Sequence, residues 1–144
     1  MKRVRGTCVA IDGSGVLLRG RSGAGKSDLA LRLLSTGARL VADDYTCIER
    51  SDGILRASPP ESLAGLLEVR GVGILRVNGL PEVPLVAMID LVPSTEVERL
   101  PDPAEEHILG VAVPRFRLAA FEISAAAKVR LVAEVASGKV SLQT

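Results

Sequence analysis

One stretch decides the fold of this chain: Gly20-Arg21-Ser22-Gly23-Ala24-Gly25-Lys26-Ser27. The stretch fills every fixed position of the pattern G-x-x-x-x-G-K-[ST]. Apolar residues of strand character precede it at 16–19, and apolar side chains recur at helical spacing over 26–34. A strand, a glycine-rich loop and a helix in this order predict a phosphate-binding loop, or P-loop.

Each residue type in the stretch has a physical role in holding phosphate. The glycines let successive backbone N–H groups converge on one anion without clashes from Cβ atoms. The N-terminus of the helix that follows adds a partial positive charge. Lys26 would supply a cation for the β- and γ-phosphates, and the Ser27 hydroxyl would ligate Mg²⁺. The stretch therefore predicts a site for a nucleoside triphosphate or another polyphosphate, and it leaves the reaction open.

Composition excludes several classes of function. The chain has 144 residues, 24% of them charged, with a formal net charge of +1 and 2% aromatic residues. Balanced charge and few aromatic residues argue against a nucleic acid as partner. No apolar run reaches the roughly 18 to 20 residues of a membrane span, and no apolar signal-peptide segment follows the basic residues 1–5. We expect one globular domain, 1–144, that is cytoplasmic and has no membrane partner.

Cysteine and histidine are scarce, which narrows the chemistry further. Cys8 and Cys47 form no C-x-x-C pair, so buried reduced thiols are expected rather than a disulfide or a structural zinc site. His107 is the only histidine, and we expect it in a loop or at a strand edge rather than in the site.

Short apolar runs predict an α/β domain whose mixed sheet does not follow a regular βαβ alternation. Helices are predicted at 26–34 and 124–136. Strands are predicted at 7–11, 16–19, 39–42, 45–49, 54–57, 66–69, 74–77, 85–92 and 109–113. The Pro-bearing segment 93–106 is predicted to be a loop or a short helical turn.

Carboxylates after the P-loop are the candidates for the chemistry. Asp43 and Asp44 end the apolar run 39–42, at the strand edge where α/β sites gather. They could position a metal or accept a proton, although aspartate is also common at a strand-to-turn boundary. Glu68 and Arg70 would lie on one face of a strand, where a simple cross-strand ion pair is the alternative.

Together, residues 9–48 and 67–77 resemble the C-terminal catalytic domain of bacterial HPr kinase/phosphorylase. After the P-loop, the family has a Leu-Val-Ala-Asp-Asp run, matched at 40–44. Its Leu-Glu-Ile-Arg-Gly-Leu-Gly-Ile signature is matched by Leu67-Glu68-Val69-Arg70-Gly71-Val72-Gly73-Ile74. The resemblance implies a P-loop domain with a mixed sheet, like that of phosphoenolpyruvate carboxykinase. It also implies assembly as a hexamer, and transfer of the ATP γ-phosphoryl, with Mg²⁺, to a serine of the phosphocarrier protein HPr.

The resemblance assigns roles to individual residues. All eight residues of the P-loop stretch would bind the nucleotide, with Lys26 on the phosphates. Ser27 and Glu68 would lie on the metal side. Asp44, with Asp43 beside it, would take the serine proton, and the sequence leaves open which of the two does so. Arg99, in Val97-Glu98-Arg99-Leu100, matches a catalytic arginine of the family.

Three departures from the family favour kinase activity over the family's phosphorolytic reaction. We expect the short single-domain α-proteobacterial form, because the family's N-terminal domain is not recognisable in this sequence. Arg5 stands where the family has a catalytic-site histidine; it could hold a phosphate but cannot shuttle a proton. The segment linked to phosphorolysis is not recognisable over 121–130.

Two other functions fit the P-loop. One is a small P-loop kinase for a nucleoside or metabolite, although the chain leaves little length for acceptor-binding segments. The other is a non-catalytic ATP sensor, against which the intact Asp43, Asp44 and Glu68 argue. Arg115 and Arg117 alternate around Phe116 and could form a docking or phosphate-facing edge, or a solvated strand face.

Overall fold

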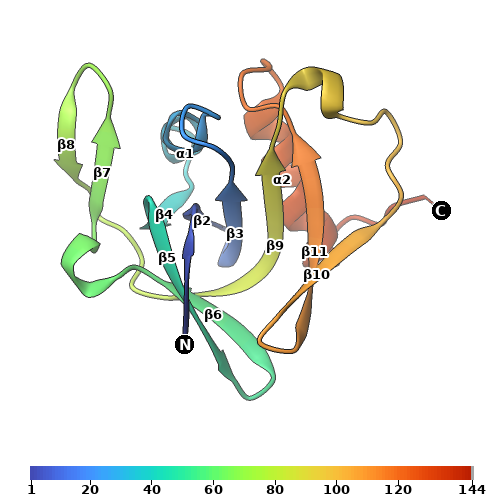
Figure 1. The fold of residues 1–144 in the computed structure, drawn as a ribbon, viewed down its shortest axis with the longest axis horizontal. Coiled ribbons are helices and arrows are strands. Elements are labelled where there is room, and N and C mark those ends of the chain that lie inside the picture. The colour runs from blue at the N-terminus through green and yellow to red at the C-terminus, as the bar shows by residue number, and fades with distance from the viewer. Residues whose placement is uncertain (144) are drawn as a thin grey trace.

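The computed structural model describes residues 1–143. Its elements, in chain order, are β1 (Lys2–Arg5), β2 (Thr7–Ile11), β3 (Ser14–Arg19), α1 (Lys26–Leu34), β4 (Arg39–Ala42), β5 (Tyr45–Ser51), β6 (Ile54–Ser58), the 3₁₀ turn η1 (Glu61–Leu63), β7 (Leu66–Val69), β8 (Gly73–Arg76), β9 (Val83–Leu91), the 3₁₀ turn η2 (Ser94–Glu96), β10 (Ala104–Ile108), β11 (Val111–Leu118) and α2 (Ala125–Ala136). Figure 1 shows their arrangement.

Nine strands form one mixed sheet in the order β1-β5-β6-β9-β3-β2-β4, with the hairpin β10–β11 joined to β9 through β11. β9 pairs in parallel with both β3 and β11. The C-terminal ends of these three strands therefore lie at the same edge of the sheet, where their arrowheads point in Figure 1. The loops that follow the three strands consequently meet at this edge.

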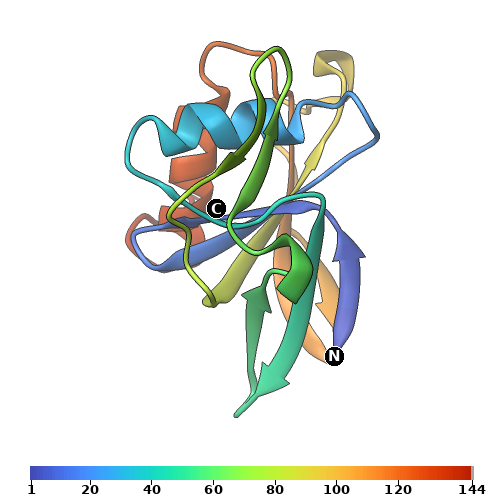
Figure 2. The ribbon, with the colours of Figure 1, turned by 90° about the vertical axis from the view of Figure 1, so that its left-hand side faces the viewer.

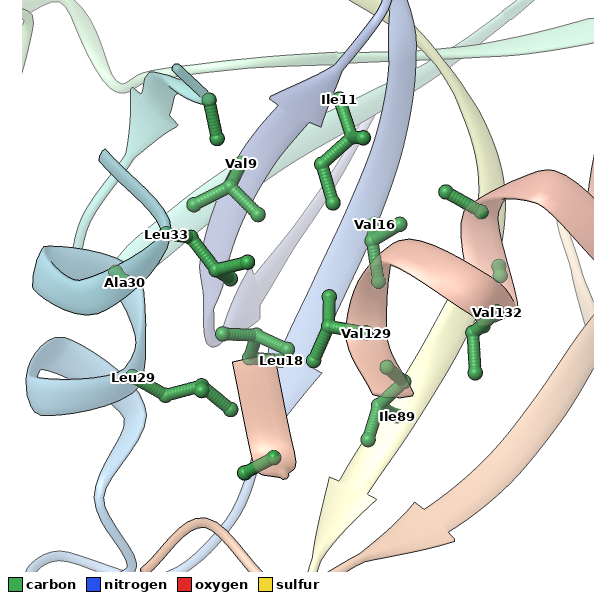
Figure 3. Packing of buried hydrophobic residues seen from close by; sticks show 14 of the residues in the cluster. Val9, Ile11, Val16, Leu18, Leu29, Ala30, Leu33, Ile89, Val129 and Val132 are labelled. Carbon is green, nitrogen blue, oxygen red and sulfur yellow. The ribbon is translucent and has the colours of Figure 1, made fainter. Parts of the chain in front are cut away.

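Helices α1 and α2 cover one face of the sheet and enclose the first core cluster (Figure 3). Leu29 and Leu33 of α1 are four residues apart, so both point to the same side of the helix. They pack with Val129 of α2 and with Val9 and Leu18 of β2 and β3. This packing fixes α1, and with it the loop that leads into α1, against the sheet.

A second core cluster lies on the opposite face, where strands rather than helices supply the cover. Cys8 and Ala10 of β2 point into it, whereas Val9 and Ile11 point to the helices. Ile48 of β5 and other side chains of β6, β10 and β11 complete it. The sheet therefore curls over itself, and the hairpin β5–β6 extends away from the two helices in Figure 2. Because both faces of β2 are covered, its sequence is a continuous apolar run.

The mixed α/β fold predicted from the sequence is confirmed, including helix α1 at its predicted bounds. The prediction of a strand at 109–113 was wrong at its start. Leu109 and Gly110 form the turn between β10 and β11, with φ values of 50° and 81°. β10 itself lies partly inside the segment predicted to be a loop.

Edge strands account for the missed elements. β1 and β10 lie at edges of the sheet and carry the sequences Lys-Arg-Val-Arg and Ala-Glu-Glu-His-Ile. Charged side chains are common on edge strands because they oppose pairing with other chains, and they remove the apolar alternation by which a strand is predicted. His107 is exposed on β10, at a strand edge as expected.

Both cysteines are buried and unpaired, as the sequence predicted. Burial raises the pKa of the Cys8 thiol to about 12, which keeps it protonated and unreactive near neutral pH. Among residues 1–143, no helix has the length and apolar character needed to cross a membrane.

Candidate active site

The P-loop connects β3 to α1 at the sheet edge described above. Gly23 and Gly25 have φ values of 85° and 102°, a left-handed conformation that side chains disfavour. A Cβ atom on Gly25 would lie 2.7 Å from the Cβ of Ala120 and 3.0 Å from Cζ of Phe121, whereas a Cβ on Gly23 would meet nothing within 4 Å. Glycine at 25 is therefore needed both for the turn and for close contact with the segment before α2.

Lys26 begins α1 and folds its side chain back over the loop. Its Nζ donates hydrogen bonds to the carbonyl oxygens of Gly20 (2.7 Å) and Arg21 (3.2 Å). Burial against the loop, and then the charge of Arg5, lower the pKa of this amine. The first N–H groups of a helix have no intrahelical acceptor. The loop, these N–H groups and the amine together form a cradle for an anion.

Asp43 lies at the end of β4 and is held on both oxygens. Its Oδ1 accepts hydrogen bonds from Oγ1 of Thr7 (2.9 Å) and Oγ of Ser27 (3.0 Å). Its Oδ2 accepts one from the backbone N–H of Glu68 (3.4 Å). Because the Ser27 hydroxyl donates its hydrogen to Asp43, its lone pairs are free for a cation. A hydroxyl and a carboxylate side by side are the hard oxygen ligands that Mg²⁺ takes together with substrate phosphates, so the residues present fit this ion.

Asp44 sits in a different environment from its neighbour. Its φ of 68° is unusual for a non-glycine residue. The N–H of Tyr45 donates to the carbonyl of Asp43 (2.8 Å) and closes a tight turn around Asp44. The turn leaves the Asp44 side chain exposed, with Oδ1 3.5 Å from Nη2 of Arg5. Strained backbone of this kind concentrates at functional sites, which supports a role for this carboxylate.

Arg5 reaches the site from the edge strand β1. The strand pairs Arg5 with Tyr45, and the guanidinium of Arg5 lies 5.5 Å from the centroid of the Tyr45 ring. Arg3 lies over the same ring at 4.5 Å. Sequence reasoning placed Arg5 in the site but missed Tyr45 and Thr7. A hydroxyl residue at the start of the apolar run 7–11 was the signal that could have drawn attention to Thr7.

The remaining predicted residues divide into those near the site and those apart from it. Glu68 reaches Asp43 through its backbone N–H, while its side chain is exposed on β7. Arg70 lies in the turn of the hairpin β7–β8, not on a strand face with Glu68. Arg99 is exposed between η2 and β10 and forms no hydrogen bond or ion pair with the described residues. The metal-side role of Glu68 and the catalytic role of Arg99 stay predictions.

A groove of about 1080 Å³ opens on the other side of the P-loop. Residues 20–24 of the loop form one wall. The other walls are formed by residues 90–94 with Glu96, at and after the end of β9, and by Arg117 with residues 119–122, at and after the end of β11. The walls therefore come from the ends of parallel strands and from the loops that follow them at one sheet edge. Arg117 therefore faces the groove, whereas Arg115 lies 3.7 Å from the Glu106 carboxylate.

A cluster of ion pairs, formed by Arg19, Asp90 and Glu106, lies at the end of β3 directly before the P-loop. Arg19, the last residue of β3, donates from Nε to Asp90 on β9 (2.9 Å) and from both terminal nitrogens to Glu106 on β10 (2.9 Å each). Hydrogen bonding from Arg19 lowers the pKa of the Glu106 carboxyl. Because Gly20 follows directly, these bonds tie the start of the P-loop to β9, which pairs with β3, and to the edge strand β10.

Comparison with known proteins places these features in a family. The chain matches the family model for the HPr serine kinase C-terminal domain over residues 1–144. An HPr kinase/phosphorylase of Clostridium botulinum is 47% identical over 78 residues, covering 54% of this chain and 26% of that protein. That of Streptococcus thermophilus is 42% identical over 127 residues, covering 80% of this chain and 41% of that protein. The chain thus spans less than half the length of these curated relatives.

A solved structure has the same fold. It is that of the HPr(Ser) kinase/phosphatase from Coxiella burnetii, with a TM-score of 0.85 and 24% sequence identity over 96% of this chain and 98% of that one.

Proposed function

The chain belongs to the HPr serine kinase C-terminal domain family, and from this premise we propose that it is an ATP-dependent protein kinase that phosphorylates a serine of an HPr-type phosphocarrier protein. The observation that carries the proposal is the unlike setting of two adjacent carboxylates beside a P-loop. Asp43 is buried against Ser27, and Asp44 is exposed beside Arg5.

In the proposed reaction the P-loop and Lys26 hold the phosphates of ATP. Ser27 and Asp43 would hold Mg²⁺, which would neutralise negative charge on the nucleotide phosphates. Asp44 takes the proton of the acceptor serine hydroxyl as the serine oxygen bonds to the γ-phosphorus. The bond between the γ-phosphorus and the bridging oxygen breaks, and that oxygen leaves with ADP. Exposure suits Asp44 to this role, because an acceptor protein must reach the carboxylate from solvent.

Arg5 suits the kinase reaction in this scheme. An arginine side chain, unlike a histidine, does not serve as a proton shuttle, so Arg5 would hold a phosphoryl oxygen or the Asp44 carboxylate. Asp44 is then the proton acceptor of the pair. The curated relatives are named HPr kinase/phosphorylase. Phosphorolysis by this chain would be a separate activity, which the same site would have to support with Arg5 at the position of the family's histidine.

The transfer is tested directly with γ-labelled ATP, Mg²⁺ and purified HPr. Label is expected on wild-type HPr and not on HPr whose target serine is replaced by alanine. The variant Lys26→Ala is expected to lose labelling together with ATP affinity. ATP binding without label on HPr would contradict the proposal and support a different acceptor or a nucleotide sensor.

We also propose that the protein acts in the cytoplasm as a homo-oligomer, a hexamer on the family resemblance. The hairpin β7–β8 supports an interface, since Val72 and Ile74 are 70% and 72% exposed and apolar patches of this kind mark contact surfaces. Light scattering on the purified chain tests the assembly. A monomer at micromolar concentration would contradict it without affecting the proposed chemistry.

A further inference from the structure

The two sides of the P-loop carry different chemistry. Lys26, Ser27, Asp43, Asp44 and Arg5 gather on one side, within the hydrogen bonds and ion pair described above. The groove on the other side is lined by none of these five residues. A triphosphate seated on the loop has two ends, and its γ-phosphate must face Asp44 for transfer. Its other end, the nucleoside, is left to extend into the groove.

The lining of the groove suits a flat, partly apolar group. Leu91, Val92 and Pro93 line one wall, and Ala120 and Phe121 line the other. The charged residues of the lining are Arg21, Asp90, Glu96, Arg117 and Glu122. Asp90 is bonded to Arg19, and Glu122 is bonded to Lys128. Carboxylates accept hydrogen bonds from ribose hydroxyls or from a base amino group, and they repel further phosphates. The apolar walls, with carboxylates and arginines both among the lining residues, therefore fit a nucleoside, whose base and ribose offer hydrogen-bond donors and acceptors.

Phe121 is the side chain best placed to contact the base. It is 71% exposed, unusual for an aromatic residue, and its ring edge lies against Gly25 of the P-loop. The segment that carries it is fixed to α1, because the guanidinium of Arg32 donates hydrogen bonds to the carbonyl oxygens of Ala120 and Glu122. A ring held in position beside a phosphate site offers a stacking surface at little cost in entropy.

We propose that this groove is the nucleoside subsite and that the base of the nucleotide stacks on Phe121. The inference rests on the proposed function, because it takes the P-loop to hold the triphosphate of ATP. Ile123 provides a matched control: it lies two residues further along, is 104% exposed, and does not line the groove.

The test compares calorimetric affinities for ATP and for inorganic tripolyphosphate, each with Mg²⁺. Phe121→Ala is expected to weaken ATP binding about tenfold or more, as for loss of an aromatic platform under a base, and to leave tripolyphosphate binding unchanged. Phe121→Tyr is expected to keep ATP affinity, and Ile123→Ala to change neither affinity.

Two outcomes would overturn the inference while the P-loop assignment stands. In one, Phe121→Ala binds ATP as the wild type does, which would place the base elsewhere. In the other, it weakens ATP and tripolyphosphate equally, which would make Phe121 a support for the loop rather than a contact for the base. Failure of the wild type to bind either ligand would instead refute the proposed function, and the inference with it.

Discussion

Two identical side chains, adjacent in sequence, acquire different chemistry through one backbone turn. Asp43 directly follows β4, is buried, and accepts three hydrogen bonds, whereas the positive φ of Asp44 turns the next carboxylate out to solvent. The sequence pattern marked both as candidates but could not separate them. The separation depends on the turn and on Thr7, which approaches from a strand 36 residues earlier.

Two glycines of the P-loop provide a test at the residue scale. Gly25→Ala is expected to lower the free energy of unfolding and to abolish ATP binding, because the new Cβ would clash with Ala120 and Phe121. Gly23→Ala shares the positive φ but meets open space, so only backbone strain of about 1 kcal/mol is expected. Urea unfolding of both variants measures the difference. Equal destabilisation would contradict the packing described around Gly25.

The strands of the site that are buried on both faces were predicted from the sequence. β3 and β4 each contain an uninterrupted apolar run, at 16–18 and 40–42. The predicted bounds, 16–19 and 39–42, lie close to or match the observed Ser14–Arg19 and Arg39–Ala42. The polar edge strand β1 was not predicted, since its residues Lys2–Arg5 lack an apolar alternation and gain their strand structure only by pairing with β5. That pairing, which is a tertiary contact, is what delivers Arg5 to Asp44.

The groove could not be predicted from the sequence, because it too depends on tertiary contacts. Its walls come from the ends of parallel strands and from the segments that follow β3, β9 and β11, and their proximity depends on two parallel pairings over long sequence separations. Phe121 therefore looked like an ordinary residue of a segment before a helix. The P-loop, in contrast, was recognised because all its residues are contiguous.

The ion cluster that joins β3, β9 and β10 gives a prediction that depends on pH. The pKa of Glu106 is lowered from its ordinary value of 4.5 by Arg19, so its contribution to stability is present above that value and is lost as pH falls through the lower, folded-state pKa. Glu106→Gln is expected to cost about 1 kcal/mol at pH 7, a small value because the pair is partly exposed.

The difference between Glu106→Gln and the wild type should vanish at acidic pH, once Glu106 is protonated in both the folded and the unfolded protein. Urea unfolding at pH 7 and at a series of lower pH values measures how the difference changes with pH. Glu105→Gln is the control, because the neighbouring Glu105 is exposed and forms no ion pair with the described residues. A cost that stays constant with pH would contradict the assignment.

For the whole molecule, the decisive property is that one sheet edge gathers the P-loop, the groove and the paired aspartates from distant parts of the chain. A ligand at this edge bridges segments from the first and last thirds of the sequence. It should therefore stabilise the complete fold rather than a single loop.

ATP with Mg²⁺ is accordingly expected to raise the free energy of unfolding by about 2.7 kcal/mol when its free concentration is a hundred times its dissociation constant. Chemical denaturation with and without the nucleotide measures the shift. Lys26→Ala should show a much smaller shift at the same concentration. An equal shift in that variant would mean that ATP stabilises the protein from another site.

The role of Asp44 is tested by single-turnover phosphoryl transfer to HPr by Asp44→Asn, with ATP affinity measured on the same protein. The control is Asp52→Asn, because Asp52 is an aspartate of similar positive φ in the distant hairpin turn between β5 and β6. We predict that Asp44→Asn binds ATP like the wild type and transfers the phosphoryl about 10² to 10⁴ times more slowly, the contribution typical of a general base. Transfer at the wild-type rate would contradict the role of Asp44.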